Sequence, residues 1–386
     1  GTNALTWDGS AETNGSFNIT GSSQADTITG GAQADTITAG SGDDTLNFVS
    51  GTELSKDLSV DGGSGIDTIK FTQSGIVDVD DTDFVNVSNI EAIVFGNGNN
   101  ISTLSTNVAT ASAASLLTIS SGTGSDEFDL SGLVKTTAIS TNTGTDTIIL
   151  GTNLTSSDTI DGGAGTDELR FTDSGSATSD LDGVTNVETV TLGDAATSVT
   201  TVDALVGNGE TLTVSAAALT GTNALTWDGS AETNGSFNIT GSSQADTITG
   251  GNGDDSINGG AGNDTLAGGG GFGADIISGG LGSDTFYFSV GSKSTILSMD
   301  TVTDFIANED KFDFSISPNQ VVTSSQYKLA GTGDLQSDIS QAVNSGGSLN
   351  DKVVYIVEIT GTGEGNFLFF DENADNDVGI NEIVLC

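Results

Sequence analysis

Aspartates recur at a nine-residue spacing in two parts of the chain. From Gly21 the units read GSSQADTIT, then GAQADTIT after Gly30, then AGSGDDTLN, which ends at Asn47. From Gly241 they read GSSQADTIT, GGNGDDSIN, GGAGNDTLA, then GGFGADIIS after a two-residue insertion, and GGLGSDTFY. Each unit offers one carboxylate and the carbonyl oxygens of a glycine-rich turn. Oxygen ligands of this kind suit Ca²⁺, whereas transition metals prefer nitrogen or sulfur.

The two halves of each unit predict how these carboxylates are brought together. Glycines allow the tight turn, and the following D-T-I or D-T-L predicts a very short strand with one inward apolar side chain. Two units would then form one coil, so that units n and n+2 stack. We therefore expect Asp26 to face Asp44, Asp246 to face Asp264, Asp255 to face Asp275, and Asp264 to face Asp284. Carboxylates about 4.8 Å apart would repel one another without a cation.

The two runs supply most of the candidate metal ligands. They are Asp26, Asp35 and Asp44 in the first run, and Asp246, Asp255, Asp264, Asp275 and Asp284 in the second. The first run is less regular, because Gln24 and Gln33 stand where the turn usually has Gly. Single units at Gly62 and Gly162 add Asp67 and Asp167, for which a metal site and a plain turn both stay open.

A further candidate lies near the C-terminus. Asp371, Asn373 and Asp375 follow the order of an EF-hand loop, with Glu382 eleven positions after Asp371. Asn376 replaces the glycine of that loop, so a β-hairpin turn between the strands FLFF and EIVL is the alternative.

Composition excludes several classes of function. The 386 residues carry 53 Asp and Glu against 8 Lys and Arg, a net charge of −45, with no His and with Cys386 as the single Cys. No Ser-His-Asp triad, Cys-His pair or thiolate zinc site can form, and we expect no enzyme activity. So acidic a chain repels nucleic acid and anionic lipid. No apolar run reaches the roughly 18–20 residues that cross a bilayer, so we expect no transmembrane segment.

Two longer repeats organise the rest of the chain. Residues 1–31 recur letter for letter at 221–251, which includes Trp7 and its copy Trp227. We expect these tryptophans to be core or cap aromatics, with a binding role as the alternative. A looser repeat matches LSVDGGSGIDTIKFTQSG (58–75) to DTIDGGAGTDELRFTDSG (158–175), and continues from VNVSNIEAIVFG (85–96) to DGVTNVETVTLG (182–193).

These patterns predict an all-β chain in four regions. We expect a first run of turns over 1–47, a degenerate β-solenoid without regular metal turns over 48–220, a calcium-binding parallel β-roll over 221–290, and a β-rich C-terminal cap over 291–386. A short helix is expected over 334–346 within that last region.

The nonapeptide GGxGxDxUx resembles the RTX repeat, a calcium-binding parallel β-roll. The segment GGLGSDTFYFSVGSKSTILSMDTVTDFIANEDKFDFS (279–315) is similar to those that close such a roll and precede a secretion signal. The middle repeats resemble bacterial S-layer proteins and large RTX surface proteins. The resemblance implies several bound Ca²⁺ ions, export by type I secretion machinery of a Gram-negative bacterium, and a place outside the cell or on its surface.

The expected function follows from calcium-dependent folding. Calcium binds only the folded chain, so millimolar calcium outside the cell would fold it. We expect a structural protein that associates with itself into a surface layer or filament, with an anchor to cell-surface polysaccharide through a region not identified. The alternatives are the end of a large RTX adhesin and the secretion domain of a larger exoprotein.

Overall fold

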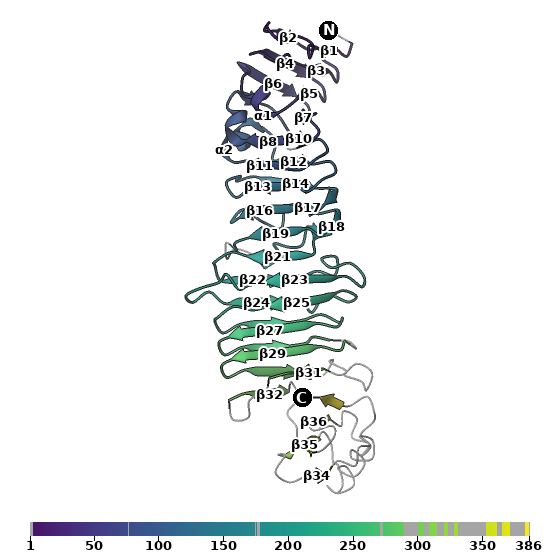
Figure 1. Ribbon diagram of the computed structural model, residues 1–386, viewed down its shortest axis with the longest axis vertical. Helices are drawn as coiled ribbons and strands as arrows, with labels where there is room; N and C mark the ends of the chain where they lie inside the picture. Colours follow the sequence, from purple (N-terminus) through teal and green to yellow (C-terminus); the bar gives the residue numbers. More distant parts are fainter. Residues whose placement is uncertain are drawn as a thin grey trace. The chain divides into compact units, whose positions relative to one another are not determined.

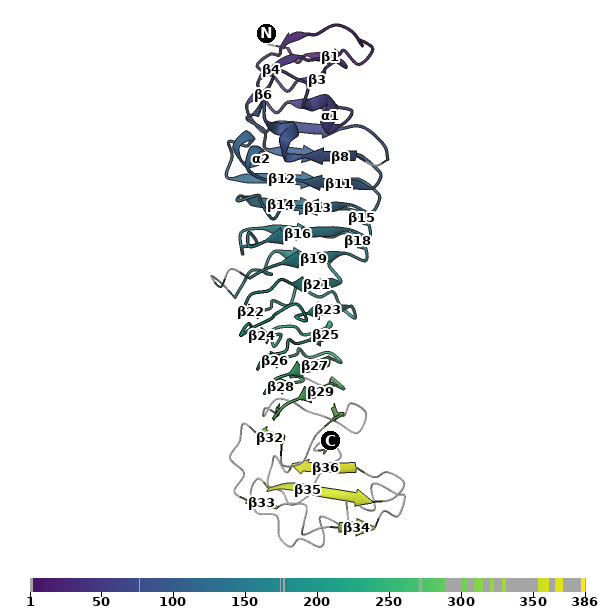
Figure 2. The same cartoon turned by 60° about the vertical axis from the view of Figure 1, so that its left-hand side comes forward.

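The computed structural model describes residues 3–75, 77–173, 175, 178–270, 273–288, 300–304 and 309–314, and five strands beyond them at 320–322, 328–330, 353–360, 365–370 and 383–385. The chain divides into two units, Gly1–Gly193 and Asp194–Cys386. Both units contain coils of short parallel strands (Figures 1 and 2), so the expected all-β solenoid is confirmed.

One face of the first unit is a nine-stranded parallel sheet. Its strands follow one another in chain order, and each is separated from the next by the rest of a coil. They are β1 (Thr6–Asp8), β3 (Thr27–Thr29), β5 (Thr45–Phe48), β7 (Thr68–Phe71), β10 (Ala92–Val94), β12 (Leu116–Ser120), β14 (Thr136–Ser140), β17 (Thr159–Asp161) and β20 (Val184–Thr185).

The strands that alternate with this face along the chain form further parallel ladders. The first ladder contains β2 (Asn18–Thr20), β4 (Thr36–Ser41), β6 (Ser59–Ser64) and β9 (Val87–Ser88). The second contains β8 (Val77–Asp80), β11 (Asn100–Thr103), β13 (Glu127–Asp129), β16 (Thr147–Gly151), β19 (Glu168–Phe171) and β21 (Thr189–Leu192). The short strands β15 (Thr143–Gly144) and β18 (Ala164–Gly165) pair at a turn, and the one-turn helices are α1 (Gly51–Leu54), η1 (Asp81–Phe84) and α2 (Thr106–Ala111).

The core of the first unit is a column of aliphatic side chains in register. Ile28 lies opposite Leu46, and Leu46 lies opposite Ile69 on the next coil. The column continues through Ile93, Ile119, Ile139 and Ile160, all at most 3 % exposed. A single inward residue per three-residue strand therefore suffices to bury a continuous apolar ladder. This confirms the strand predicted for the D-T-I and D-T-L half of the unit.

The second unit repeats this arrangement. One ladder contains β22 (Thr197–Thr200), β24 (Leu225–Asp228), β26 (Thr247–Thr249), β28 (Thr265–Ala267), β30 (Thr285–Phe288) and β32 (Lys311–Phe314). The other contains β23 (Thr211–Ser215), β25 (Ser236–Thr240), β27 (Ser256–Ala261), β29 (Ile276–Leu281) and β31 (Thr301–Val302). Trp227, Ile248, Leu266 and Phe286 stack in its core, each fully buried.

The strands nearest the C-terminus include antiparallel pairs. They are β33 (Gln320–Val322), β34 (Lys328–Ala330), β35 (Val353–Thr360), β36 (Gly365–Phe370) and β37 (Ile383–Leu385). β36 pairs antiparallel with β37, which confirms FLFF and EIVL as partner strands. The residues 371–382 between them, the predicted helix over 334–346 and Cys386 lie outside the described residues.

Coil length shows where the nine-residue period holds. Thr27 pairs with Thr45 and Thr247 with Thr265, so these coils contain 18 residues, or two units, as predicted. The next coil, from Thr265 to Thr285, contains 20 residues. The sequence placed its two extra residues before the unit that starts at Gly270. The structure instead places Gly268 at the first turn position, beside Gly250 on the preceding coil. The two extra residues therefore lie within the turn, after Gly269.

Candidate metal sites

The predicted stacking of aspartates is confirmed, but their contacts differ from those expected. In each predicted pair, the Oδ1 atom of the later Asp accepts a hydrogen bond from the backbone N–H of the Asp on the preceding coil. The N···O distances are 2.7 Å from Asp26 to Asp44, 2.8 Å from Asp246 to Asp264, 2.9 Å from Asp255 to Asp275 and 2.9 Å from Asp264 to Asp284. One oxygen of each carboxylate thus holds the neighbouring coil, which leaves Oδ2 for another partner.

These columns extend into residues 48–220, the region predicted to be a degenerate solenoid without regular metal turns. The N–H of Asp44 donates to Asp67 (2.8 Å), so the single unit at Gly62 has a stacked neighbour. A second column runs through three successive coils, from Asp126 to Asp146 (2.7 Å) and from Asp146 to Asp167 (2.8 Å). The single unit at Gly162 is therefore part of a column as well.

Each of these two columns ends at a glutamate. The N–H of Asp67 donates to Glu91 Oε2 (2.8 Å), and that of Asp167 donates to Glu188 Oε2 (2.7 Å). Two residues before each glutamate stands an asparagine with positive φ, Asn89 at 55° and Asn186 at 52°. Both copies of the looser repeat read Asn-aliphatic-Glu, which is the sequence signal for these glutamates. The nonapeptide pattern could not reveal them, because its acidic position is Asp.

Other column members were also missed from the sequence. Their Oδ1 atoms accept the N–H of a candidate ligand, with Asp35 donating to Asp57 (2.8 Å), Asp275 to Asp300 (3.2 Å) and Asp284 to Asp310 (2.9 Å). None of these three acceptors follows a Gly-Gly pair, so the nonapeptide pattern could not find them.

The turns fall into two classes according to what Oδ2 contacts. We call a turn closed when its own second residue donates a backbone N–H to Oδ2. Ser22 donates to Asp26 (2.5 Å), and the remaining closed turns place Gly31 on Asp35 (2.6 Å), Ser242 on Asp246 (2.6 Å) and Gly251 on Asp255 (2.7 Å). In the two serine turns the hydroxyl also donates to Oδ1, at 2.9 Å and 2.8 Å.

We call a turn open when its Asp Oδ2 is buried without a hydrogen-bond partner. This holds for Asp44, Asp67, Asp126, Asp146, Asp167 and Asp264. Each of these side chains is at most 2 % exposed. An oxygen buried in this way costs free energy unless a partner approaches it.

Backbone conformation distinguishes the two classes of turn. In the open turns of the nonapeptide type the second residue is a glycine with positive φ, as at Gly40 (115°), Gly63 (101°), Gly163 (91°) and Gly260 (105°). In the closed turns the second residue does not have positive φ. Serine avoids that region of conformational space, whereas glycine enters it freely, so Ser22 and Ser242 favour the closed form.

The first glycine of each turn leaves a space beside the carboxylate. A Cβ atom at Gly259 would lie closer than 3.0 Å both to Asp264 Oδ2 and to the carbonyl oxygen of Gly279 on the next coil. At Gly62 it would meet Asp67 Oδ2 and the Asn89 carbonyl oxygen in the same way. A carboxylate oxygen and a carbonyl oxygen from the next coil therefore converge where glycine has no side chain.

Burial raises the pKa of most column aspartates. Desolvation is the main cause for Asp264 and Asp255, whose pKa rises to about 7, and for Asp67 and Asp167, whose pKa rises to about 6. Burial and the nearby charge of Asp300 raise the pKa of Asp275 to about 8.

Asp26 shows the opposite direction. Burial opposes its ionisation, but hydrogen bonds from Leu5 and Ser22 hold its pKa below the usual value. A closed turn can therefore stabilise its own carboxylate without a cation. Asp255 keeps a raised pKa although its turn is closed, because it is more deeply buried and lies near Asp254 and Glu232.

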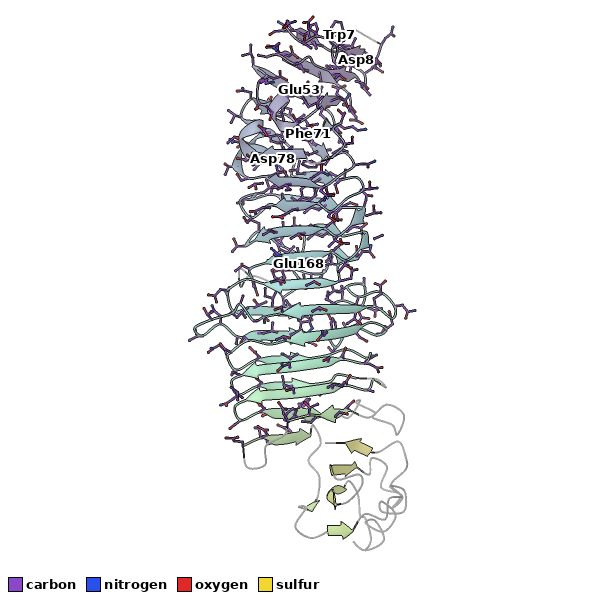
Figure 3. The ribbon with its side chains drawn as sticks, viewed as in Figure 1. Trp7, Asp8, Glu53, Phe71, Asp78 and Glu168 are labelled. Atoms are coloured by element: carbon purple, nitrogen blue, oxygen red, sulfur yellow. The ribbon has the colours of Figure 1, made fainter. Side chains whose placement is uncertain are left out.

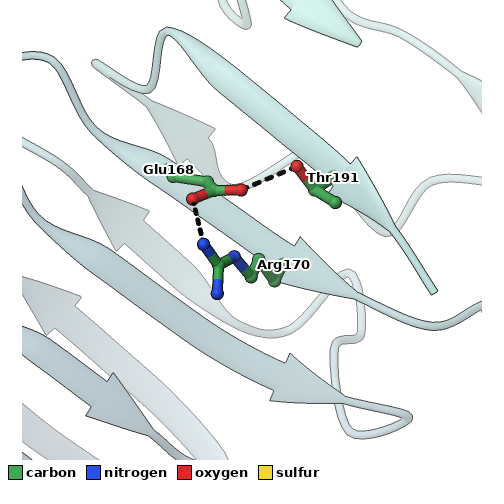
Figure 4. A network of polar contacts seen from close by, with 3 residues as sticks. All are labelled: Glu168, Arg170 and Thr191. Atoms are coloured by element: carbon green, nitrogen blue, oxygen red, sulfur yellow. Dashed lines mark hydrogen bonds and ion pairs between the residues drawn. The ribbon is translucent and has the colours of Figure 1, made fainter. Parts of the chain in front are cut away.

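The cations of the described residues form no ion pair with these columns. Among the described residues one ion pair is found, between Arg170 and Glu168 at 2.7 Å. Figure 4 shows that Glu168 also accepts a hydrogen bond from the Thr191 hydroxyl (2.7 Å), on the outward side of β19 and β21. Both charged side chains are partly exposed, so this pair contributes little to stability.

The donor atoms fit a hard cation. Within the described part of the chain no three acidic side chains converge on one point, so backbone carbonyls must supply most of the ligands. One carboxylate oxygen and several carbonyl oxygens match the preference of Ca²⁺ for six to eight oxygen ligands. Asp371, Asn373 and Asp375 lie outside the described residues and stay a prediction.

Comparison with protein families identifies the repeat. Residues 18–51, 154–171, 240–272 and 270–292 match the RTX calcium-binding nonapeptide repeat. These segments contain the closed turns and the open turns at Asp44, Asp167 and Asp264. The match implies calcium binding by the repeats, while the open turns at Asp67, Asp126 and Asp146 lie outside it. No curated protein matches the chain.

Proposed function

We propose that this RTX calcium-binding β-roll protein is a secreted structural protein of the surface of a Gram-negative bacterium. Calcium folds it, and the folded chain associates with itself into a layer or filament. The observation that carries the proposal is the set of six buried carboxylate oxygens without a partner in a chain with a net charge of −45. Two lie on successive coils at Asp44 and Asp67, three on successive coils at Asp126, Asp146 and Asp167, and one at Asp264.

The energetics favour a fold that depends on calcium. A buried polar atom left unsatisfied costs about 1–3 kcal/mol, and more when it is charged. Several such oxygens together are comparable with the roughly 5–15 kcal/mol that stabilises a whole domain. Bound calcium supplies the positive charge and the coordination that these oxygens lack. Asp44, Asp67 and Asp264 would hold it together with carbonyl oxygens of the adjoining glycine turns.

The turns outside the nonapeptide match belong to the same proposal. Asp126 and Asp146 have the same orphaned Oδ2, and Asn100 Oδ1, on the coil before Asp126, is also buried without a partner. Gly124 and Gly144, two residues before these aspartates, have positive φ, as do the glycines at the same position of the other open turns, Gly42, Gly65, Gly165 and Gly262. We infer that the middle of the chain is folded by calcium too, which makes the first unit as dependent on calcium as the second.

Export and location fit this behaviour. A chain with one Cys and one Pro forms no internal disulfide and has a single prolyl bond to isomerise, so it can pass a type I channel unfolded and fold outside. Among the described residues no helix is long and apolar enough to span a bilayer. We assign no catalytic role. Attachment to the cell through surface polysaccharide is part of the proposal.

One observation favours an alternative. The exact duplication of residues 1–31 at 221–251 is typical of tandem arrays, which would suit the extension region of a large adhesin. The secretion domain of a larger exoprotein would also fold on calcium. Both alternatives share the calcium step and differ from the surface layer in what the folded chain does next.

Calcium titration of the calcium-depleted chain tests the proposal. Circular dichroism should report a gain of β-structure with a midpoint of roughly 10⁻⁴–10⁻³ M, as for extracellular calcium modules. Light scattering on the same samples should rise after folding if the chain assembles. Folding without a rise supports the adhesin alternative. An identical response to Mg²⁺, or no transition, would remove the calcium argument.

A further inference from the structure

One coil of the first unit crosses from strand to strand by a shorter path than the nonapeptide turn on which it stacks. Asp61 pairs with Ser88 and Ile69 pairs with Ile93, so a step of eight residues through the nonapeptide turn corresponds to a step of five on the next coil. The short connection is Asn89–Glu91, and we call it a compact turn. It is three residues shorter than the turn on which it stacks.

A second compact turn lies further along the chain. Asp161 pairs with Thr185 and Leu169 pairs with Val190, which again sets a step of eight residues against a step of five. This compact turn is Asn186–Glu188. The same departure from the nonapeptide therefore occurs twice.

Figure 3 helps to locate both places. Phe71 ends strand β7, which follows the Asp67 turn, and Glu168 begins strand β19, which follows the Asp167 turn. The compact turns precede β10 and β21, the strands that pair with β7 and β19. Each compact turn thus lies one coil after an open nonapeptide turn.

Glutamate takes the place of the final aspartate in each compact turn. The N–H of Asp67 donates to Glu91 Oε2 (2.8 Å), and that of Asp167 donates to Glu188 Oε2 (2.7 Å). The glutamate side chain is one methylene longer than that of aspartate, and this reach makes up for the shorter backbone path. The described residues provide no donor to Oε1 of either glutamate, so that oxygen is available to a further partner.

Asparagine takes the place of the first glycine in each compact turn, because Asn89 stacks on Gly62. The Asn89 amide nitrogen donates to Asp61 Oδ1 (2.7 Å), and its φ is 55°. Asn186 repeats this arrangement with Asp161 (2.7 Å) and a φ of 52°. Asparagine enters the left-handed region more readily than most residues. The amide bond to the preceding coil then fixes the direction of the asparagine carbonyl group.

The asparagine carbonyl oxygen and the aspartate carboxylate meet at one point. A Cβ atom at Gly162 would lie within 3.0 Å of both the Asn186 carbonyl oxygen and Asp167 Oδ2. The equivalent point at Gly62 was described above. In both places the aspartate Oδ2 is buried without a hydrogen-bond partner. Each point therefore has an orphaned carboxylate oxygen and a carbonyl oxygen held toward it.

Two carboxylates share each of these places. Burial is the main cause of the raised pKa of Asp67, and the charges of Asp44 and Glu91 add to it. For Asp167 burial is again the main cause, and the added charges include that of Glu188. An ion bound here would meet two carboxylates and a backbone carbonyl, which are the oxygen ligands that Ca²⁺ prefers.

We propose that each compact turn is the second half of a Ca²⁺ site, in which the glutamate carboxylate and the asparagine carbonyl oxygen bind the ion held by the aspartate Oδ2 of the preceding nonapeptide turn. The inference rests on the calcium binding proposed above for the open turns. It adds Glu91 and Glu188 as ligands from a turn of another sequence, Asn-aliphatic-Glu, which the nonapeptide does not contain.

Removal of the glutamate charge tests the assignment. Glu91→Gln and Glu188→Gln, introduced together in the full chain, keep an oxygen that can accept the aspartate N–H but remove the carboxylate. Hydrogen exchange by mass spectrometry along a calcium titration reports on each turn separately. In the double variant the calcium midpoint of protection over 62–67 and 162–167 should rise by at least the roughly 10–100-fold that loss of an outer-shell partner costs.

The turn at Asp264 supplies an internal reference, because its column continues to Asp284 and not to a glutamate. The midpoint over 259–264 should stay unchanged in the double variant. Glu127→Gln, at an exposed glutamate of strand β13, controls for a general loss of negative charge and should shift no midpoint. Each single variant should shift the midpoint of its own segment alone, and it provides the same test if the double variant does not fold.

The same titration separates this inference from the calcium proposal on which it rests. Calcium-dependent protection in all three segments, with the same midpoints in the double variant as in the unchanged chain, would remove the two glutamates as ligands and leave the calcium proposal standing. An equal shift in all three segments would also overturn the assignment. No calcium-dependent protection in any segment of the unchanged chain would remove both proposals.

Discussion

The turns that end at Asp246 and Asp264 belong to neighbouring coils of one column but treat their carboxylates differently. Asp246 receives the N–H and the hydroxyl of Ser242 and the N–H of Leu225 on the preceding coil, so both of its carboxylate oxygens have donors. Asp264 holds the coil before it through Oδ1 but leaves Oδ2 buried without a partner. The comparison teaches that one repeat takes two forms, one in which the turn itself supplies a donor to Oδ2 and one in which Oδ2 is buried without a donor.

Removal of calcium should have the largest effect. At limiting calcium we expect the open turns to lose protection from hydrogen exchange before the closed turns, because only the open turns have an oxygen that nothing else satisfies. Exchange measured by mass spectrometry should rise first over 124–126, 144–146 and 262–264, and later over 21–26 and 241–246. Simultaneous exchange in all these segments would contradict the division into two classes.

Acidification should partly replace calcium. The raised pKa values of Asp67, Asp167 and Asp264, at about 6 to 7, mean that the folded state binds protons more tightly than the unfolded chain. Their contribution to stability is therefore complete below the unfolded pKa of about 4 and is lost as pH rises through 6 to 7. We expect the calcium-depleted chain to melt at a higher temperature at pH 5 than at pH 8.

Saturating calcium should reverse that dependence, because protons then compete with the ion for the same oxygens. Thermal melts in calcium-depleted and calcium-loaded buffers at both pH values give the four melting temperatures to be compared. A melting temperature that is lower at pH 5 than at pH 8 without calcium would contradict the presence of buried, unpaired carboxylates in the folded chain.

A pair of matched substitutions should differ in sign. Asp264→Asn removes a buried unpaired charge, so it should stabilise the calcium-depleted chain and destabilise the calcium-loaded one. Asp246→Asn should destabilise both, by about 1–3 kcal/mol, since an amide cannot accept all the hydrogen bonds that Ser242 donates. Denaturant melts with and without calcium measure both effects. The same response from the two variants would mean that their turns do not differ.

The smallest effect is expected from the serine hydroxyl itself. Ser242→Ala keeps the backbone N–H on Asp246 but removes the hydroxyl that bridges Asp246 Oδ1 (2.8 Å) and the Gln244 N–H (3.0 Å). A loss of about 1 kcal/mol is expected in the free energy of unfolding. The control variant Ser243→Ala, at the exposed neighbouring residue, should change the free energy of unfolding by less than about half that amount.

The sequence predicted the solenoid, the 18-residue coil and four stacked aspartate pairs, because those features depend only on a spacing that can be counted. It did not predict the column through Asp126 and Asp146, where coils of 20 and 21 residues hide the nine-residue period. The open and closed forms were also unpredictable, since Gly251 and Gly260 are the same residue at the same turn position yet differ in φ.

The hydrogen bonds of the aspartate columns all have one direction. In each of these pairs the carboxylate accepts from the N–H of the coil that precedes it, as Asp44 does for Asp26 and Asp284 for Asp264. Each bond joins the backbone of one coil to the side chain of the next coil. Loss of the Asp44 carboxylate would therefore free the Asp26 N–H on the preceding coil and leave the Asp44 N–H on Asp67 in place. Damage at one carboxylate of a column is thus felt by the coil on its N-terminal side.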